Sequence, residues 1–222
     1  MFGRLDASSF NGSSVFRSGE FEIILSKVVA CYNCMLSDGV QVPNDENGIR
    51  DTLLINYLRN NEVRQQLDMA KWMFDRETLE DHSVGRTDIR VISQNTFVQQ
   101  EAYYVLECKR LDNINTTGTT GLNAEYIKNG IIRFTSKYYS SFYRVNGMIG
   151  FVVTPLDIHA NTDCINTLLE TSFNEANTNR KITQANFIDG FEYHYSSSHS
   201  DSDNVPLDIY HLMFDFSGNI SS

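Results

Sequence analysis

Three charged residues lie in two apolar segments that follow one another closely in the chain. Asp88 lies within the first segment, Gly85–Val91, while Glu107 and Lys109 lie at the end of the second, Tyr103–Arg110. Carboxylates can hold a divalent cation, and a lysine beside them can offset the negative charge that builds on a phosphate under attack. These residue types in this arrangement predict metal-assisted hydrolysis of a phosphodiester bond.

The spacing of Glu107 and Lys109 places both side chains on one face of a β-strand. Side chains of a strand alternate between its faces, so Cys108 is expected to point to the opposite side. Lys109 is the only lysine of the chain that has an acidic residue two positions before it. Because chance alone gives roughly one such pair in a chain of this composition, the β-prone context carries the prediction. The alternative interpretation is a solvated sheet face or a structural cluster of ion pairs.

The segment between the two candidate strands is short and polar, which favours an antiparallel hairpin. Such a hairpin brings Asp88 and Arg90 beside Glu107 and Lys109. Two carboxylates held side by side repel one another, and each costs free energy to desolvate. The sequence therefore predicts a functional site at this end of the sheet.

Hydrophobic periodicity and capping residues predict the surrounding elements. A helix is expected from Glu46, where Asn44 or Asp45 can cap it after Pro43. The expected helices span residues 20–36, 46–59, 122–138 and 163–176, and the expected strands span residues 71–78, 86–93, 102–110, 147–154, 191–197 and 207–216. Residues 1–19 are rich in Ser and Gly and are expected to form a flexible arm, whereas residues 20–222 form one domain.

The chain of 222 residues is acidic, with 28 Asp and Glu against 18 Lys and Arg. This net charge disfavours indiscriminate binding to nucleic acid. Residues 86–144 differ from the rest because they contain eight basic and five acidic residues, which permits local contact with phosphate. No run of 18 apolar residues and no apolar leader is present, and the four cysteines include one CxxC pair without further ligands. We expect a cytoplasmic protein with reduced thiols and no membrane association.

The order of helix, three strands, helix and strand around these residues resembles the core of the PD-(D/E)XK nuclease superfamily. Thr87-Asp88 corresponds to its Pro-Asp step, Glu107-Cys108-Lys109 to its acid-x-Lys motif, and Glu46 to the glutamate that many members carry before the strands. The resemblance covers about residues 46–153. It implies an α/β fold with a restriction-endonuclease-like αβββαβ core, in which a central mixed sheet is flanked by helices. The N-terminal helix and the C-terminal pair of strands are additions to this core.

The resemblance implies that Asp88, Glu107 and the backbone carbonyl of Cys108 hold Mg²⁺ or Mn²⁺. Lys109 would orient or deprotonate the attacking water, and Glu46 would complete the arrangement. Candidate phosphate contacts are Arg86, Arg90, Arg110, Lys128 and Arg133. The expected partner is nucleic acid, DNA rather than RNA, and a homodimer is left open. Two alternatives are a non-catalytic nucleic-acid-binding or assembly module that retains the fold, and an acidic protein-interaction domain with an incidental Glu-x-Lys.

Overall fold

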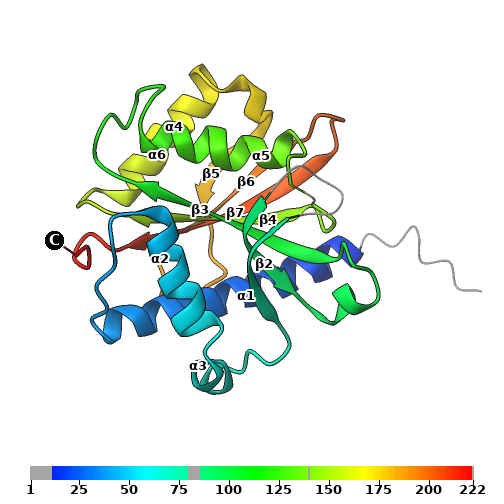
Figure 1. Cartoon of the computed structure of the whole chain (residues 1–222). Coiled ribbons are helices and arrows are strands. Elements are labelled where there is room, and N and C mark those ends of the chain that lie inside the picture. The colour runs from blue at the N-terminus through cyan, green and yellow to red at the C-terminus, as the bar shows by residue number, and fades with distance from the viewer. Residues whose placement is uncertain (1–11, 80–85, 140, 222) are drawn as a thin grey trace, which may run out of the picture.

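The protein is an α/β structure in which helices cover both faces of one sheet. The computed structural model describes residues 12–79, 86–139 and 141–221. In Figure 1, helices α4, α5 and α6 lie on one side of the sheet, whereas α1, α2 and α3 lie on the other. A sheet covered on both sides can bury long apolar strands, and all eight residues of β4 (Val145–Val152) are buried.

Seven strands form the sheet in the order β1-β2-β3-β4-β7-β6-β5. Their bounds are β1 (Met73–Leu79), β2 (Arg86–Ile92), β3 (Tyr103–Leu111), β4, β5 (Thr178–Gln184), β6 (His194–Ser200) and β7 (Pro206–Asp215). The pairs β3–β4 and β4–β7 are parallel, and the other neighbours are antiparallel. The predicted mixed sheet, including the antiparallel pair of β2 and β3, is therefore confirmed.

Two of the three layers are helical. The helices are α1 (Gly12–Ser37), α2 (Glu46–Leu53), α3 (Asn61–Gln66), α4 (Leu122–Tyr126), α5 (Ile132–Thr135) and α6 (Ile158–Thr171). Helix α2 continues as a π-helical turn over Leu54–Leu58, and a second such turn over Ile127–Ile131 joins α4 to α5. Within the described ranges, no helix has the length and apolar character needed to cross a membrane.

Strand β3 divides the hydrophobic core into two clusters because its side chains alternate between the faces of the sheet. Tyr104, Leu106 and Cys108 belong to the cluster beneath α1 and α2. Tyr103, Val105 and Leu111 belong to the cluster beneath α4–α6. Glu107 and Lys109 therefore share the face covered by α4 and α5, opposite to Cys108, as the alternation predicts.

Gly130 weakens the helical pattern of residues 122–138, and the structure explains its presence. A Cβ atom at this position would come within 2.3 Å of the Met148 side chain on β4. Glycine therefore allows the helical segment to approach the sheet closely. The same close packing brings Arg133 of α5 over the middle of β3, where Glu107 lies.

The predicted elements differ from the structure at several places. Helix α3 was not predicted, and β6 begins at His194 rather than at residue 191. Helix α1 begins at Gly12, inside the segment expected to be an arm, and residues 1–11 lie outside the described residues. The helix expected over residues 163–176 is shifted, since α6 begins at Ile158 and ends at Thr171. Strand β5 was not predicted. It is an edge strand whose one buried side chain is Ile182, so its sequence lacks the apolar alternation on which a prediction depends.

A chain of buried hydrogen bonds crosses the core beneath α4. The hydroxyl of Tyr126 lies 2.8 Å from His211 Nδ1, and Ser197 Oγ lies 2.8 Å from both His211 Nε2 and His199 Nε2. His199 Nδ1 lies 2.9 Å from the carbonyl oxygen of Ala176. Because a carbonyl can only accept, His199 donates through Nδ1 and its Nε2 accepts from Ser197. Burial lowers the pKa of His199 to about 4 and that of His211 well below its ordinary value, so both rings are neutral.

Candidate active site

The side chain of Asp88 bridges β2 and β3 just beyond their last backbone pair. The two strands pair from Ile89–Leu106 to Ile92–Tyr103. One residue beyond that ladder, Asp88 Oδ2 accepts the N–H of Cys108 at 2.8 Å. The carboxylate therefore replaces a backbone acceptor, and this bond fixes Asp88 beside the Glu107-Cys108-Lys109 segment.

The ammonium group of Lys109 lies at the centre of the predicted site. Its Nζ atom is 2.8 Å from Glu107 Oε1, 3.0 Å from Glu46 Oε1 and 2.6 Å from the carbonyl oxygen of Cys108. Asp88 Oδ2 lies slightly farther away, at 3.7 Å. All four groups that the sequence assigned to metal binding and catalysis therefore converge on the ammonium group of Lys109.

Glu46 reaches this point because it is the first residue of α2. Asp45 caps the helix by accepting the N–H of Gly48 at 2.7 Å, which is one of the two caps predicted from the sequence. Helix α2 packs against β3 (Figure 1). A carboxylate in the first helical turn is also stabilised by the helix dipole. The predicted position of Glu46, at the start of a capped helix, is therefore confirmed.

Arg50 is part of the site and was not predicted. It lies one turn after Glu46 on α2, and its residue exposure is 1%. Its Nη1 atom is 2.9 Å from Asp88 Oδ1, while Nε and Nη2 donate to Asp51 at 3.1 and 2.9 Å. The sequence feature that could have revealed Arg50 is an arginine beside Ile49 on an otherwise apolar helix face. An arginine buried there requires anionic partners.

Glu107 is almost completely buried, at 1% exposure, and carries the most perturbed carboxyl group of the site. Burial raises the pKa of Glu107 to about 7, the charge of Asp88 adds to this effect, and Lys109 opposes it. Its Oε1 atom also accepts from Arg133 Nη1 at 3.1 Å. Its Oε2 atom is buried and has no hydrogen-bond partner among the described residues. A buried carboxylate oxygen without a donor indicates a place where a ligand can bind.

Arg133 and Tyr139 form the side of the site opposite to α2. Arg133 Nη1 donates to the hydroxyl of Tyr139 at 2.7 Å, and its guanidinium lies 5.0 Å from the ring centre of Tyr138. These contacts hold the guanidinium beside Glu107. Tyr139 was not predicted as a site residue, and its position depends on the turn that follows α5.

Both buried cations of the site stay charged. Burial lowers the pKa of Lys109, but the charges of Glu107, Asp88 and Glu46 outweigh it, so its net pKa is raised. For Arg50, the cost of burial is likewise outweighed by Asp51 and Asp88, and the pKa is raised. The site therefore balances its carboxylates with fixed positive charges.

The oxygen donors of the site fit a hard divalent cation. Carboxylates of Asp88 and Glu107 and the Cys108 carbonyl are the donors that Mg²⁺ and Mn²⁺ prefer, and Glu107 Oε2 has no other partner. In the described part of the chain, no group of three or more His, Cys, Asp or Glu side chains has the arrangement of a metal site. The carboxylates instead face Lys109 and Arg50.

The other basic residues predicted as phosphate contacts do not gather at the site. Arg90 pairs with Asp75 at 3.1 Å, and Lys128 donates to the carbonyl of Thr119. Arg110 donates to Asn44, just before α2, and is the one of these three that lies next to the site in the chain. The side chain of Arg86 lies outside what the structure describes. Arg133 does lie in the site, where its ion pair is with Glu107.

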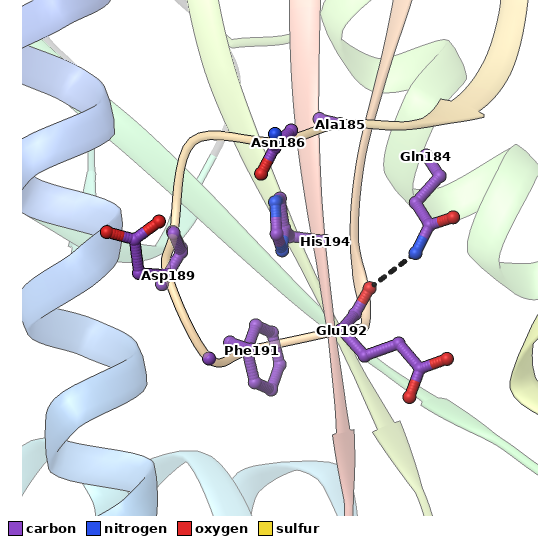
Figure 2. A pocket seen from close by; sticks show the side chains of 9 residues that line it. Gln184, Ala185, Asn186, Asp189, Phe191, Glu192 and His194 are labelled. Atoms are coloured by element: carbon purple, nitrogen blue, oxygen red, sulfur yellow. Dashed lines mark hydrogen bonds between the residues drawn. The ribbon is translucent and has the colours of Figure 1, made fainter.

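A separate open pocket of about 710 Å³ lies at the loop between β5 and β6. Figure 2 shows the loop around His194, with Phe191 beside the imidazole and the hydrogen bond from Gln184 to the carbonyl of Glu192. The residues that line this pocket include Asp189 and Glu192 and no lysine or arginine. Two carboxylates in a lining without lysine or arginine disfavour phosphate, so this pocket is unsuited to a nucleic-acid backbone.

Comparisons of the chain with protein-family models, with curated proteins and with solved structures give no match.

Proposed function

We propose that the protein is a metal-dependent nuclease that hydrolyses phosphodiester bonds of DNA. The observation that carries this proposal is the convergence of Glu46, Asp88, Glu107 and the Cys108 carbonyl on Lys109. These residues come from one helix and two strands, and the succession of a helix, three strands, a helix and a strand around them resembles the order expected for a restriction-endonuclease-like core. A buried cluster of this kind costs free energy, which makes it a candidate for function.

The chain's own residues suggest how the reaction would be supported. Asp88, Glu107 and the Cys108 carbonyl would hold Mg²⁺ or Mn²⁺, which would lower the pKa of a bound water and polarise the phosphate. Lys109 is charged and held by three oxygen atoms, so stabilising the negative charge on the phosphate suits it better than removing a proton. Glu46 would orient the ammonium group and the attacking water.

Nucleic acid is supported as the substrate by the local charge. Residues 86–144 contain eight basic and five acidic residues in a chain that is acidic as a whole. Arg110 lies one residue from Lys109 and is partly exposed, which suits contact with a phosphate beside the cleaved bond. An acidic remainder would limit non-specific binding elsewhere on the surface.

The test is cleavage of plasmid DNA by the purified chain in millimolar Mg²⁺ or Mn²⁺. Lys109→Met keeps the apolar stem and removes the charge, and we expect it to reduce cleavage by about 100-fold or more. Lys181→Met is the matched control, because Lys181 is exposed and pairs with Glu170 away from the site. Circular dichroism of both variants establishes that they fold.

Wild-type protein that cleaves neither DNA nor RNA with either metal would contradict the proposal, as would cleavage that continues in excess chelator. Salt-dependent DNA binding without cleavage would instead favour the non-catalytic module. That alternative has one observation in its favour, which is that every carboxylate of the site already has a cationic partner.

A further inference from the structure

Helix α2 contributes two opposite charges to the site, one helical turn apart. Glu46 pairs with Lys109 at 3.0 Å, and Arg50 pairs with Asp88 at 2.9 Å. The helix thus supplies a carboxylate to the lysine and a guanidinium to the aspartate. The second contact has no place in the function argued above and needs its own explanation.

Arg50 is held rigidly in this position. Two of its nitrogen atoms, Nε and Nη2, donate to the same oxygen of Asp51, and the other oxygen of Asp51 accepts from Arg76 at 2.8 Å. With a side-chain exposure of 1%, Arg50 has no solvent-filled space into which it could turn. A guanidinium also keeps its charge at all physiological pH values. Arg50 is therefore a permanent, fixed positive charge beside Asp88.

The two oxygen atoms of Asp88 consequently have different surroundings. Oδ1 faces Arg50, whereas Oδ2 accepts the N–H of Cys108 and faces Lys109. A divalent cation that used Oδ1 would share that oxygen with the guanidinium, and the two positive charges would repel strongly in a buried site. On the other side, Lys109 Nζ lies 3.7 Å from Oδ2, beyond hydrogen-bond distance, whereas Arg50 lies 2.9 Å from Oδ1. Oδ2 and the unpartnered Oε2 of Glu107 are therefore the more open ligand atoms.

We propose that Arg50 limits this site to one divalent cation per chain, because its guanidinium occupies the place of a second positive charge at Asp88. The inference rests on the proposed metal-dependent function and specifies the number of ions that the site takes. Arg50 is thus a positioning residue: it presents a single oxygen of Asp88 to the cation.

The experiment counts bound Mn²⁺ on the full chain by isothermal titration calorimetry and by electron paramagnetic resonance. We expect one Mn²⁺ per wild-type chain, lost in Asp88→Asn, with a spectrum that shows no coupling between neighbouring ions. Arg50→Met removes the charge but keeps most of the side-chain volume, and we expect it to bind two Mn²⁺ with spin coupling. Arg50→Lys keeps the charge and is expected to bind one.

Two coupled Mn²⁺ ions in the wild type, both lost in Asp88→Asn, would overturn this inference and leave the nuclease proposal standing. A folded Arg50→Met that still binds one ion would also overturn it. If Arg50→Met fails to fold, Arg50→Gln, which removes the charge but keeps a hydrogen-bond donor for Asp51, is counted in its place. Absence of any Mn²⁺ binding that depends on Asp88 would contradict the metal-dependent function itself, so the two failures are distinguishable.

Discussion

The ammonium group of Lys109 lies 2.8 Å from Glu107 Oε1, and both side chains are buried. This pair is the centre of a cluster in which carboxylates alternate with cations. Asp88 has Arg50, Glu46 has Lys109, and Glu107 has both Lys109 and Arg133. The repulsion between Asp88 and Glu107 that the sequence suggests is therefore offset by interleaved positive charges, and this arrangement determines how variants should behave.

Asp88→Asn is expected to destabilise the protein by roughly 1–3 kcal/mol in the presence of chelator, because it leaves the buried Arg50 without one of its anionic partners. Asp75→Asn is the control, since Asp75 of β1 pairs with Arg90 of β2 but is partly exposed, and its expected loss is below about 1 kcal/mol. Urea unfolding measures both. A more stable Asp88→Asn would mean that repulsion from Glu107 outweighs the pairing with Arg50.

Glu107→Gln should change how stability depends on pH. Burial raises the pKa of Glu107 from 4.5 to about 7, so the folded protein binds this proton more tightly than the unfolded chain. Between pH 4.5 and 7 the unfolded chain therefore ionises first, and the wild type loses stability as pH rises. Relative to Glu107→Gln, the wild type should lose on the order of 3 kcal/mol over this window. Unfolding at several pH values, with the exposed Glu170→Gln as control, measures the difference. If the stability of wild type and of Glu107→Gln changes with pH in parallel, the raised pKa of Glu107 is refuted.

The buried hydrogen-bonded histidines should make stability depend on pH in the opposite direction. They belong to the chain of Tyr126, His211, Ser197 and His199. Both histidines are neutral in the folded protein because burial lowers their pKa values, to about 4 for His199. Between about pH 6.5 and 4 the unfolded chain binds more protons than the folded one, so acidification through this window should destabilise the fold. His199→Gln should reduce this acid sensitivity by up to roughly 1.4 kcal/mol per pH unit. The more exposed His159→Gln is the control, and an unchanged slope in His199→Gln would contradict the prediction.

Arg110→Ala should weaken DNA binding and reduce its dependence on salt. One lost phosphate contact lowers the slope of log K against log salt concentration by about 0.9. Lys181→Ala provides the comparison, because Lys181 lies on the edge strand β5, which three other strands separate from β3 in the sheet. Binding measured in a metal that does not support cleavage, over a series of salt concentrations, gives both slopes. Equal slopes for wild type and Arg110→Ala would place the phosphate contacts elsewhere.

Features of the site that depend on local geometry could be predicted from the sequence. The two-residue spacing of Glu107 and Lys109 determines that they share a face of β3, since side chains of any strand alternate. The cap at Asp45 determines that Glu46 begins a helix, because its side chain satisfies the N–H of Gly48. The polar connection between β2 and β3 likewise predicts their antiparallel pairing. These rules act over a few residues and need no knowledge of the rest of the chain.

Relationships that cross between elements were decided by the tertiary structure. Arg50 meets Asp88, 38 residues later, because apolar residues such as Ile49 and Leu53 pack α2 against the sheet, and that packing sets the direction in which Arg50 points. Arg133 meets Glu107 because Gly130 lets the helical segment approach β4 closely. Strand β5 forms through pairing with β6 although its side chains are mostly exposed. Long-range packing and backbone pairing leave little periodic signal in the sequence, so the partners of each charge emerge only when the layers are assembled.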